Sequence, residues 1–577
     1  DLHTSALVKD GSIDWLCLPH FDSPSLFARN LDKEGGHFSV KNRGYNVKSD
    51  YDGLTAITKT SFKSQEDSFE IKDFMVPQQK PRCHEHLIVR KIKALGGSPK
   101  VKLDFSPKPD YAKRKPKIKK SQNELILRHN GKDVKLSLPE GSEIKKYSDG
   151  YEITLNLKKD EEKEIIIYQG NCSLKNQDFE KITRKFWEKW VSKGKFMNFC
   201  KTRMARSAIT LKLMQFYPTG AIIASPTTSL PEEIGGERNW DYRYSWIRDA
   251  TFTLYGLHVL GYREEAERFF SFIEKVAKKC KGGTANLDLV YTIDGNRVLG
   301  EKKLNHLEGY KKSKPVRIGN DAAKQFQLDV YGSLLDSYYF MSKRDLKISS
   351  DGKRVVKDLV EAIKKNWKKP DNGIWEVRKN KEDFTYSKVM AWVGVDRAIR
   401  LANKLKIPKK KVEEWKALRH EISSWIWENC FDSKKEKFKQ HPNTKKQDAT
   451  NCLFVLLQFL DKHDKLTQRI IDNTCKELSY KEVFVYRYKG SDGLPGKEGA
   501  FILCTFWLVS SLGILEKVSR SKKLFNEFEK HIKPLLSEEI EPKTKSYLGN
   551  FPQAFSHIGY IMSAYYLDRY EKKLGKK

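Results

Sequence analysis

The sequence predicts a multidomain β + α protein, in which an antiparallel β-sandwich precedes an all-α toroid or superhelix. The chain has 577 residues, more than one hydrophobic core usually supports. Short, evenly spaced apolar runs fill the first 175 residues, and from about residue 176 the apolar period becomes that of helices. We therefore expect a β-sandwich domain at 1–175, a helical linker at 176–199 and a helical domain at 200–577.

A first β-hairpin is predicted by two apolar runs, Ser5–Val8 and Ser12–Leu18, on either side of Asp10 and Gly11. Asp-Gly is a favoured pair at the centre of a hairpin turn, because both central positions need a positive φ. Further strand-like runs lie at 85–90, 101–105, 124–127, 151–155 and 164–168. Short strands at such even spacing are typical of a sandwich.

The helical half is marked by apolar residues at helical spacing. After Asn320, one apolar stripe is formed by Phe326, Val330, Leu334 and Tyr338. Further helices are predicted near 186–191, 204–211, 353–366, 386–404, 410–429, 448–460, 466–479, 498–516, 520–534 and 552–571. A long series of helices without intervening strands indicates an all-α ring or superhelix.

The composition is strongly basic, with 109 Lys and Arg against 75 Asp and Glu and a formal net charge of +34. Such a charge suggests nucleic acid or an anionic membrane as a partner. The lysines, however, are spread along the chain, and the dense run at 113–120 is predicted to be a solvated loop. No apolar run reaches the ~18 residues of a membrane span. We therefore expect neither nucleic acid nor a membrane as a partner.

The nine cysteines, at 17, 83, 172, 200, 280, 430, 452, 475 and 504, form no C-x-x-C motif and no close Cys/His cluster. Neither a disulfide framework nor a zinc site is predicted. Unpatterned thiols favour a reducing compartment, and we expect a cytoplasmic protein.

The segment Gly235–Ala250 combines three arginines, three acids and four aromatic residues in sixteen positions. Charged groups are rarely buried unless they are paired, and aromatic rings beside planar donors suit a sugar, which stacks and forms hydrogen bonds. We interpret the segment as the wall of a polar pocket. The alternative is a helix start with solvated charges, in which Trp240, Tyr244 and Trp246 turn inward.

Three further places hold acids that could carry chemistry. Glu376 follows Trp375, and contact with an indole removes water from a carboxyl group and favours the protonated form that a general acid needs. Glu538 and Glu539 lie in an acidic stretch that could instead be exposed charge. Glu498 lies in a loop that leads into a predicted helix, where an acid could simply stabilise the helix N-terminus.

Other chemistries find less support in the sequence. Gly235 and Gly236 lack the spacing of a phosphate-binding loop, and the chain has no Gly-x-Ser-x-Gly motif. His557 stands out among the 13 histidines, but a hydrogen-bonded structural histidine is the simpler interpretation.

Together, these residues resemble glycoside hydrolase family 15, which contains glucoamylases, glucodextranases and prokaryotic trehalases. The resemblance extends over nearly the whole chain and rests on 4–24, on the central signature at 228–250, on 384–398 and on 549–557. It implies a β-supersandwich followed by an (α/α)6 barrel with a pocket at its mouth. The segment His441–Ala449 departs from the family pattern, which is richer in Gly and Ser. The resemblance therefore does not indicate which leaving group the pocket accepts, and so does not identify the substrate.

The resemblance also implies roles for individual residues. Arg248 and Asp249 are similar to the pair that grips the hydroxyls of the terminal glucose, and Glu376 is similar to the general acid. Glu538 is similar to the general base, and Glu539 is the alternative if the match is shifted by one residue. The remaining candidates for substrate binding are Trp240, Tyr244, Trp246, Trp375, Glu498 and His557.

The first functional hypothesis is an inverting, exo-acting glycoside hydrolase that releases β-D-glucose from the ends of α-glucans or malto-oligosaccharides. The second is an α,α-trehalase that uses the same acid and base, because both substrates present the same terminal glucose. A more distant alternative is a non-catalytic scaffold that binds polyanions. We expect no metal or organic cofactor, and the sequence does not predict an oligomeric state.

Overall fold

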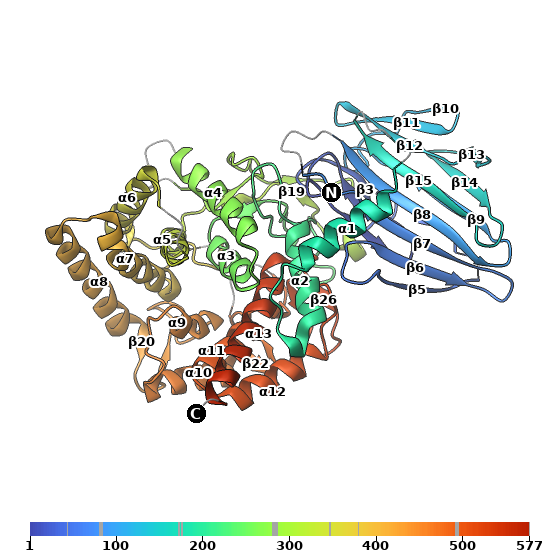
Figure 1. Ribbon diagram of the computed structural model, residues 1–577. Helices are drawn as coiled ribbons and strands as arrows, with labels where there is room; N and C mark the ends of the chain where they lie inside the picture. The colour runs from blue at the N-terminus through green and yellow to red at the C-terminus, as the bar shows by residue number, and fades with distance from the viewer. Residues whose placement is uncertain are drawn as a thin grey trace. The chain divides into compact units, whose positions relative to one another are not determined.

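The computed structural model describes residues 1–577 except 43, 80–84, 171–173, 175–176, 280–286, 345–347, 379, 491–494 and 576–577 (Figure 1). The chain forms two compact units. The first contains 1–194, 209–219 and 303–316, and the second contains 195–208, 220–302 and 317–577. Each unit therefore includes segments from both sides of residue 200.

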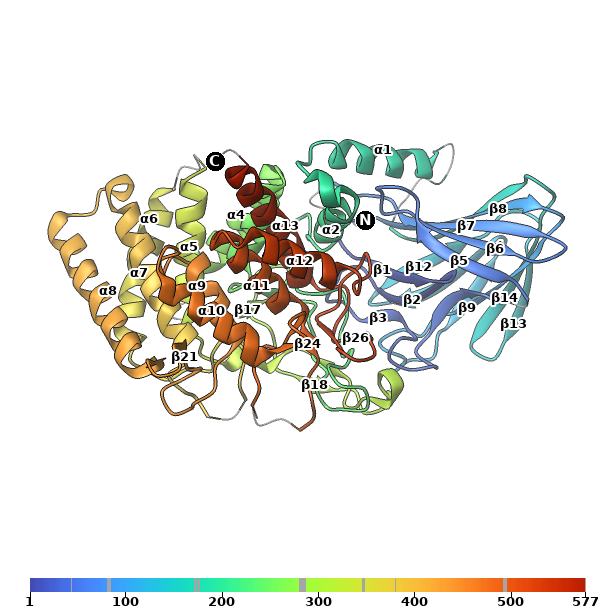
Figure 2. The same cartoon turned by 90° about the horizontal axis from the view of Figure 1, so that it is seen from below.

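The first unit is built from two antiparallel sheets, which Figure 2 shows as separate layers. One sheet has the order β1 (Ala6–Lys9), β2 (Ser12–Cys17), β4 (His37–Val40), β9 (Lys100–Ser106), β14 (Gly150–Asn156) and β13 (Glu143–Tyr147), with β3 (Ser25–Ala28) paired to β2. The other has the order β10 (Ile118–Ser121), β11 (Glu124–His129), β12 (Lys132–Ser137), β15 (Glu162–Gln169), β8 (His86–Gly96), β7 (Ser68–Met75), β6 (Thr58–Lys63) and β5 (Asn46–Tyr51).

The predicted hairpin is confirmed, since β1 pairs with β2 and both Asp10 and Gly11 have positive φ, of 51° and 74°. The other strand predictions are also confirmed by β8, β9, β11, β14 and β15. In the basic run, Lys113, Arg114, Lys115 and Lys117 are exposed as predicted, while its last residues form the edge strand β10.

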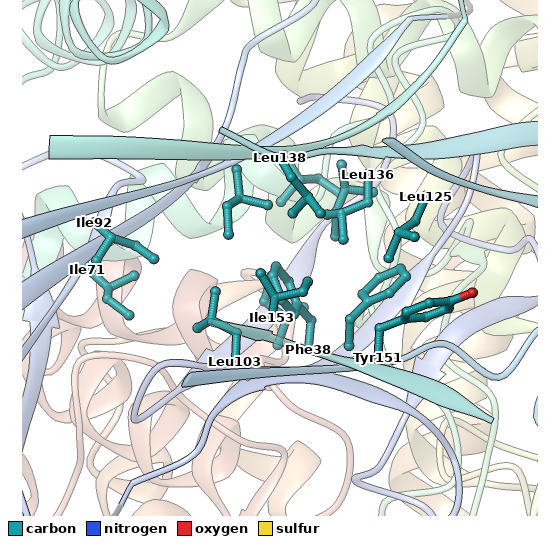
Figure 3. Close-up of a cluster of buried hydrophobic side chains, with 14 of the residues drawn as sticks. Phe38, Ile71, Ile92, Leu103, Leu125, Leu136, Leu138, Tyr151 and Ile153 are labelled. Carbon is teal, nitrogen blue, oxygen red and sulfur yellow. The ribbon is translucent and has the colours of Figure 1, made fainter. Parts of the chain in front are cut away.

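The core of the first unit lies between its two sheets. Figure 3 shows Leu125 and Leu136 of one sheet pointing towards Leu103 and Ile153 of the other. Alternate residues of each strand face this core, because successive side chains of a strand point to opposite faces. The alternating apolar runs in the sequence are thus the inner faces of a sandwich.

Helices dominate the second unit. Helices of the chain are α1 (Phe179–Val191), α2 (Lys201–Leu213), α3 (Ala250–Val259), α4 (Arg263–Lys279), α5 (Asp329–Ser342), α6 (Ser350–Asn366), α7 (Thr385–Leu405), α8 (Lys409–Cys430), α9 (Leu453–Leu456), α10 (Lys465–Leu478), α11 (Ile502–Ile514), α12 (Val518–Glu529) and α13 (Ala554–Leu574). Two-residue strands in its loops include β16 (Ser245–Trp246), β17 (Val290–Tyr291), β24 (Ala500–Phe501), β25 (Glu539–Ile540) and β26 (Tyr547–Leu548).

From α3 to α13, helices alternate between an inner and an outer position (Figure 1). Inner helices such as α5 and α11 are buried along nearly their whole length, whereas the outer helices α4, α6 and α10 bury one face. A helix that is apolar all round belongs in an interior, and an amphipathic one covers it. The inner ring closes where α13 contacts α3.

Three predicted helices begin later than expected. The stripe after Asn320 belongs to α5, but α5 begins at Asp329 and therefore excludes Phe326. Glu498 precedes β24 and α11 begins at Ile502, so Glu498 does not stabilise a helix start. In 448–460 a 3-10 turn, Ala449–Cys452, precedes the short α9, because the Asp448 side chain accepts from the backbone N–H of Thr450 and caps that turn.

Six cysteines, at 17, 200, 430, 452, 475 and 504, are buried free thiols, while Cys83, Cys172 and Cys280 lie outside the described residues. Within the described part of the chain, no helix is both long and apolar enough to cross a bilayer.

Candidate active site

A cavity lies in the second unit, where loops lead into the inner helices. Arg248 and Asp249, which directly precede α3, line it. Glu376, before α7, and Glu538, before α13, line the same cavity. Segments up to 290 positions apart in the chain thus converge on one hollow.

Arg248 and Asp249 form an ion pair on this cavity, with Arg248 Nε donating to Asp249 Oδ1 at 3.1 Å. The Nη1 of Arg248 donates to the carbonyl oxygen of Ile374 at 2.9 Å and to Gln327 Oε1 at 3.2 Å. Burial raises the pKa of Asp249 to about 7, although the adjacent guanidinium opposes the shift. The fixed guanidinium and its carboxyl partner present donors and acceptors that suit vicinal hydroxyls.

Glu376 occupies a tight turn, in which its backbone N–H donates to the carbonyl oxygen of Gly373 at 3.1 Å. Its φ is +57°, a left-handed conformation that residues other than Gly rarely adopt and that is concentrated at functional sites. The Glu376 Oε1 accepts from Trp246 Nε1 at 2.9 Å and from Arg248 Nη1 at 3.3 Å. The carboxylate, 22% exposed, is therefore held at the cavity wall.

The indole that is hydrogen-bonded to Glu376 belongs to Trp246, whereas the sequence suggested the adjacent Trp375. The Trp375 Nε1 instead donates to Asp448 Oδ2 at 3.2 Å, and its ring lies 6.1 Å from the ring of Trp507. Asp448 belongs to His441–Ala449, the segment that departs from the family pattern. This segment therefore anchors one wall of the cavity through Trp375.

The structure distinguishes the two adjacent glutamates by their surroundings. Glu538 lines the cavity and is 3% exposed, and its Oε2 has no hydrogen-bond partner among the described residues. Burial, followed by the nearby Glu232, raises the pKa of Glu538 well above its usual range, whereas a hydrogen bond from Tyr242 opposes the shift. Glu539 lies in β25, where its Oε2 accepts the backbone N–H of Gly499 at 2.8 Å.

A buried ionic network lines another part of the cavity. Glu498 binds Arg487 through two hydrogen bonds of 2.6 Å each, and it also accepts from Arg238 Nη1. Arg487 Nη2 donates to Glu232 Oε2 at 3.2 Å. Arg238, Arg487 and Glu232 line the cavity, so these charges face the space that a substrate would occupy.

Trp240 supports a guanidinium group in the cavity wall. The guanidinium carbon of Arg378, which also lines the cavity, lies 3.9 Å from the centre of the Trp240 ring. Arg317 lies over the same ring at 4.6 Å. These cation–π contacts fix the orientation of the indole.

The structure brings together most of the predicted site residues. Those that line the cavity are Trp240, Trp246, Arg248, Asp249, Trp375, Glu376 and Glu538. Tyr244, Glu498, Glu539 and His557 are outside its lining. His557 is buried; its Nε2 accepts the backbone N–H of Leu536 at 3.1 Å, and burial lowers its pKa to about 3, as expected for a structural histidine.

Several lining residues were not assigned from the sequence, namely Glu232, Arg238, Tyr242, Arg378, Arg487 and Gln553. Arg238 and Tyr242 lie within the charged and aromatic segment 235–250, and Glu232 lies just before it, so proximity to that segment was a usable signal. Arg487 had no local signal. Within the described residues, no group of three or more His, Cys, Asp or Glu side chains is placed to hold a metal ion.

Two family models match the chain. The model for glycosyl hydrolases family 15 matches residues 199–565, and the trehalase-like N-terminal model matches residues 2–185. The chain belongs to glycosyl hydrolases family 15. As a family 15 member it is a glycoside hydrolase, and a sugar is its substrate.

This family 15 chain is similar over nearly its whole length to proteins named trehalase. It is 35% identical to one from Mycobacterium tuberculosis (99% of this chain, 89% of the relative). It is 32% identical to one from Thermoplasma acidophilum (97% of each) and 30% identical to trehalase 1 of Sulfolobus acidocaldarius (97% and 96%).

Solved structures support the family 15 fold. A bacterial glucoamylase complexed with acarbose superimposes with a TM-score of 0.72 at 14% identity, covering 98% of this chain and 95% of that one. A glycosidase variant in complex with glucose gives a TM-score of 0.51 at 17% identity over 63% of this chain and 96% of that one. The predicted fold class, a β-sandwich followed by an (α/α)6 barrel, is confirmed.

Proposed function

We propose that this family 15 enzyme hydrolyses α,α-trehalose to two molecules of glucose. The support is its similarity, at 30–35% identity, to trehalases along nearly the whole chain. The sequence placed cleavage of α-glucan ends first and trehalose second, and the relatives favour the second. Both hypotheses use the same terminal glucose and therefore the same residues.

In the proposed mechanism, Arg248 and Asp249 hold the hydroxyls of the glucose that is attacked. Glu376 donates a proton to the glycosidic oxygen, and Glu538 removes a proton from the attacking water on the opposite face of the ring. The location of both carboxyl groups on one cavity supports this assignment. The unpartnered Glu538 Oε2, described above, further supports its role as the proton acceptor.

The mechanism specifies the anomers of the products. Attack by water from the face opposite the leaving group inverts the attacked carbon and gives β-glucose, while the leaving glucose keeps its α configuration. Trehalose should therefore yield equal initial amounts of α- and β-glucose, whereas a glucan end should initially release β-glucose.

The test is to incubate the protein with trehalose, maltose and soluble starch at equal concentrations of glucosidic bonds. Glucose release gives kcat/KM for each, and proton NMR before mutarotation gives the anomers. A kcat/KM for trehalose at least tenfold above the other two supports the proposal. Faster release from maltose or starch would return the glucoamylase-like hypothesis to first place, and a retained configuration would refute the assigned roles.

A further inference from the structure

Glu232 is a third carboxyl group on the cavity, and the mechanism above gives it no task. Its side chain is 1% exposed, and it lines the cavity together with Glu538. The Oε2 of Glu232 contacts Arg487 Nη2 at 3.2 Å and Arg238 Nη1 at 3.9 Å. Its Oε1 is buried and accepts no hydrogen bond of normal geometry from the described residues, although the Trp240 side chain is near enough to favour the ionised Glu232 carboxyl and so to oppose the rise in its pKa.

Glu232 is not needed to hold the two arginines. Glu498 already binds Arg487 through two hydrogen bonds of 2.6 Å each and accepts from Arg238 as well. The contacts of Glu232 with both arginines are longer. A buried carboxylate oxygen without a donor is costly, so its retention on a cavity wall indicates a ligand that supplies one.

Glu538 presents the same feature on the same cavity. Its Oε2 is also buried and without a partner in the described part of the chain. The backbone brings the two residues together: the Gly549 N–H donates to the carbonyl oxygen of Pro231, which precedes Glu232, at 2.7 Å, and a Cβ on Gly549 would lie 2.6 Å from Glu538 Oε2. Both acceptors without donors therefore belong to residues that line the same cavity.

We infer that Glu232 Oε1 and Glu538 Oε2 together bind the attacking water, each accepting one of its two O–H groups. This inference rests on the proposed function, because it takes Glu538 as the base. Water fits these acceptors because it has two donors and is the second substrate of any hydrolase. Glu232 would orient the water and stay chemically unchanged.

The proton and bond changes balance. The water oxygen forms a bond to the anomeric carbon as the bond from that carbon to the glycosidic oxygen breaks. One water proton passes to Glu538, and the Glu376 proton passes to the departing oxygen. The second water proton, held by Glu232, remains on the new hydroxyl group of the product.

The experiment compares Glu232→Gln with wild type on trehalose and on α-glucosyl fluoride. The leaving group of the second substrate is fluoride instead of a sugar. We expect kcat to fall about 100-fold on both substrates, with KM changed by less than about threefold. Azide, an anion that requires no proton removal, should restore turnover of the fluoride by forming β-glucosyl azide. The matched control is Glu233→Gln, because Glu233 is the next residue, is half-buried and is outside the cavity lining.

A pH profile provides a second measurement. The titratable and charged groups around Glu232 are Arg238, Tyr242, Arg487, Glu498, Glu538 and Glu539. Burial raises the pKa of Glu232 itself to about 7, and the ionised Glu232 in turn raises the pKa of Glu538, so the acid limb of kcat/KM should move to lower pH in Glu232→Gln. If this variant does not fold, Glu232→Asp withdraws the carboxylate from the water and should also lower kcat.

Two outcomes would overturn the inference. Near-normal kcat on both substrates would show that Glu232 does not act on the water. A raised KM without azide rescue would assign Glu232 to sugar binding or to structure, and melting temperatures would separate these. If trehalose is not the substrate, wild type will hydrolyse α-glucosyl fluoride but not trehalose. That result is distinct from a failure of the inference about Glu232, which concerns the variant.

Discussion

The indole N–H of Trp246 donates to Glu376 Oε1 at 2.9 Å, although 130 positions separate the two residues. The same carboxylate oxygen accepts from Arg248 at 3.3 Å, and Glu376 is held with a left-handed backbone. These hydrogen bonds therefore link the central segment 235–250 to the loop before α7. The orientation of the proposed acid depends on a donor that is remote in sequence.

Substituting Trp246→Phe removes this donor and keeps an aromatic ring. A hydrogen bond to a charged group contributes about 1.5–3 kcal/mol, so kcat on trehalose should fall about 10- to 100-fold. Turnover of α-glucosyl fluoride should change little, because fluoride departs without a proton. Trp427→Phe on α8 is the control, since Trp427 does not line the cavity. Equal losses on both substrates would contradict an effect through Glu376.

Comparing Glu538→Gln with Glu539→Gln tests which of these two adjacent glutamates is the general base. Glu538 lines the cavity, whereas Glu539 accepts the Gly499 N–H within a small sheet. Glu538→Gln should abolish nearly all turnover, and azide should partly restore it with α-glucosyl fluoride. Glu539→Gln keeps an acceptor for Gly499 and should retain kcat within about threefold. The reverse result would move the base to Glu539.

The sequence predicted those features that depend on local periodicity. The hairpin of β1 and β2 follows from an Asp-Gly turn between two apolar runs, and the helices α6, α8 and α10 follow from one apolar face each. The 3-10 turn at Ala449–Cys452 was missed although Asp448, which caps it, is a local signal, and the sequence could not show that Asp448 also accepts from the remote Trp375. Local spacing contains no information on such a contact.

The same distinction explains the site predictions. Arg248 and Asp249 stand in a segment whose charges and aromatic residues are visible in the sequence. Glu232 and Arg487 come together from positions 255 apart, and although Glu232 lies just before the charged segment, Arg487 has no local signal. The Trp246 partner of Glu376 was likewise missed, because adjacency in sequence favoured Trp375.

Asp329, at the start of α5, should make stability depend on pH. Burial raises its pKa from 3.8 to about 6, and both of its carboxyl oxygens lack partners among the described residues. Ionising it therefore costs stability as the pH rises from about 4 to about 6. Asp329→Asn should raise the free energy of unfolding at about pH 7.5 by up to about 3 kcal/mol, and little at about pH 4.

Urea unfolding at the two pH values measures this difference. Asp351→Asn is the control, because the Asp351 side chain is 55% exposed on α6. The nearby Arg248 guanidinium opposes the rise in the Asp329 pKa, so an Asp329→Asn variant that is less stable than wild type at the higher pH would show that the ionised carboxylate stabilises the fold through Arg248.

Gly549 allows the position of Glu538 to be tested without changing the glutamate. Gly549 has φ +75°, and a Cβ placed there would lie 2.6 Å from Glu538 Oε2. Gly235 has φ +81°, and a Cβ there would meet nothing within 4 Å. Alanine at either position should cost about 1 kcal/mol of backbone strain, which urea unfolding measures.

Gly549→Ala should in addition displace the Glu538 carboxylate, so its kcat should fall by about tenfold or more while that of Gly235→Ala stays near wild type. The comparison separates the effect of strain from the effect of the clash, because strain is common to both variants. Unchanged kcat in Gly549→Ala would mean that the Glu538 carboxylate can move away from Gly549 without loss of activity. A base positioned to accept a proton from one water could not tolerate such a shift, so that result would argue against Glu538 in this role.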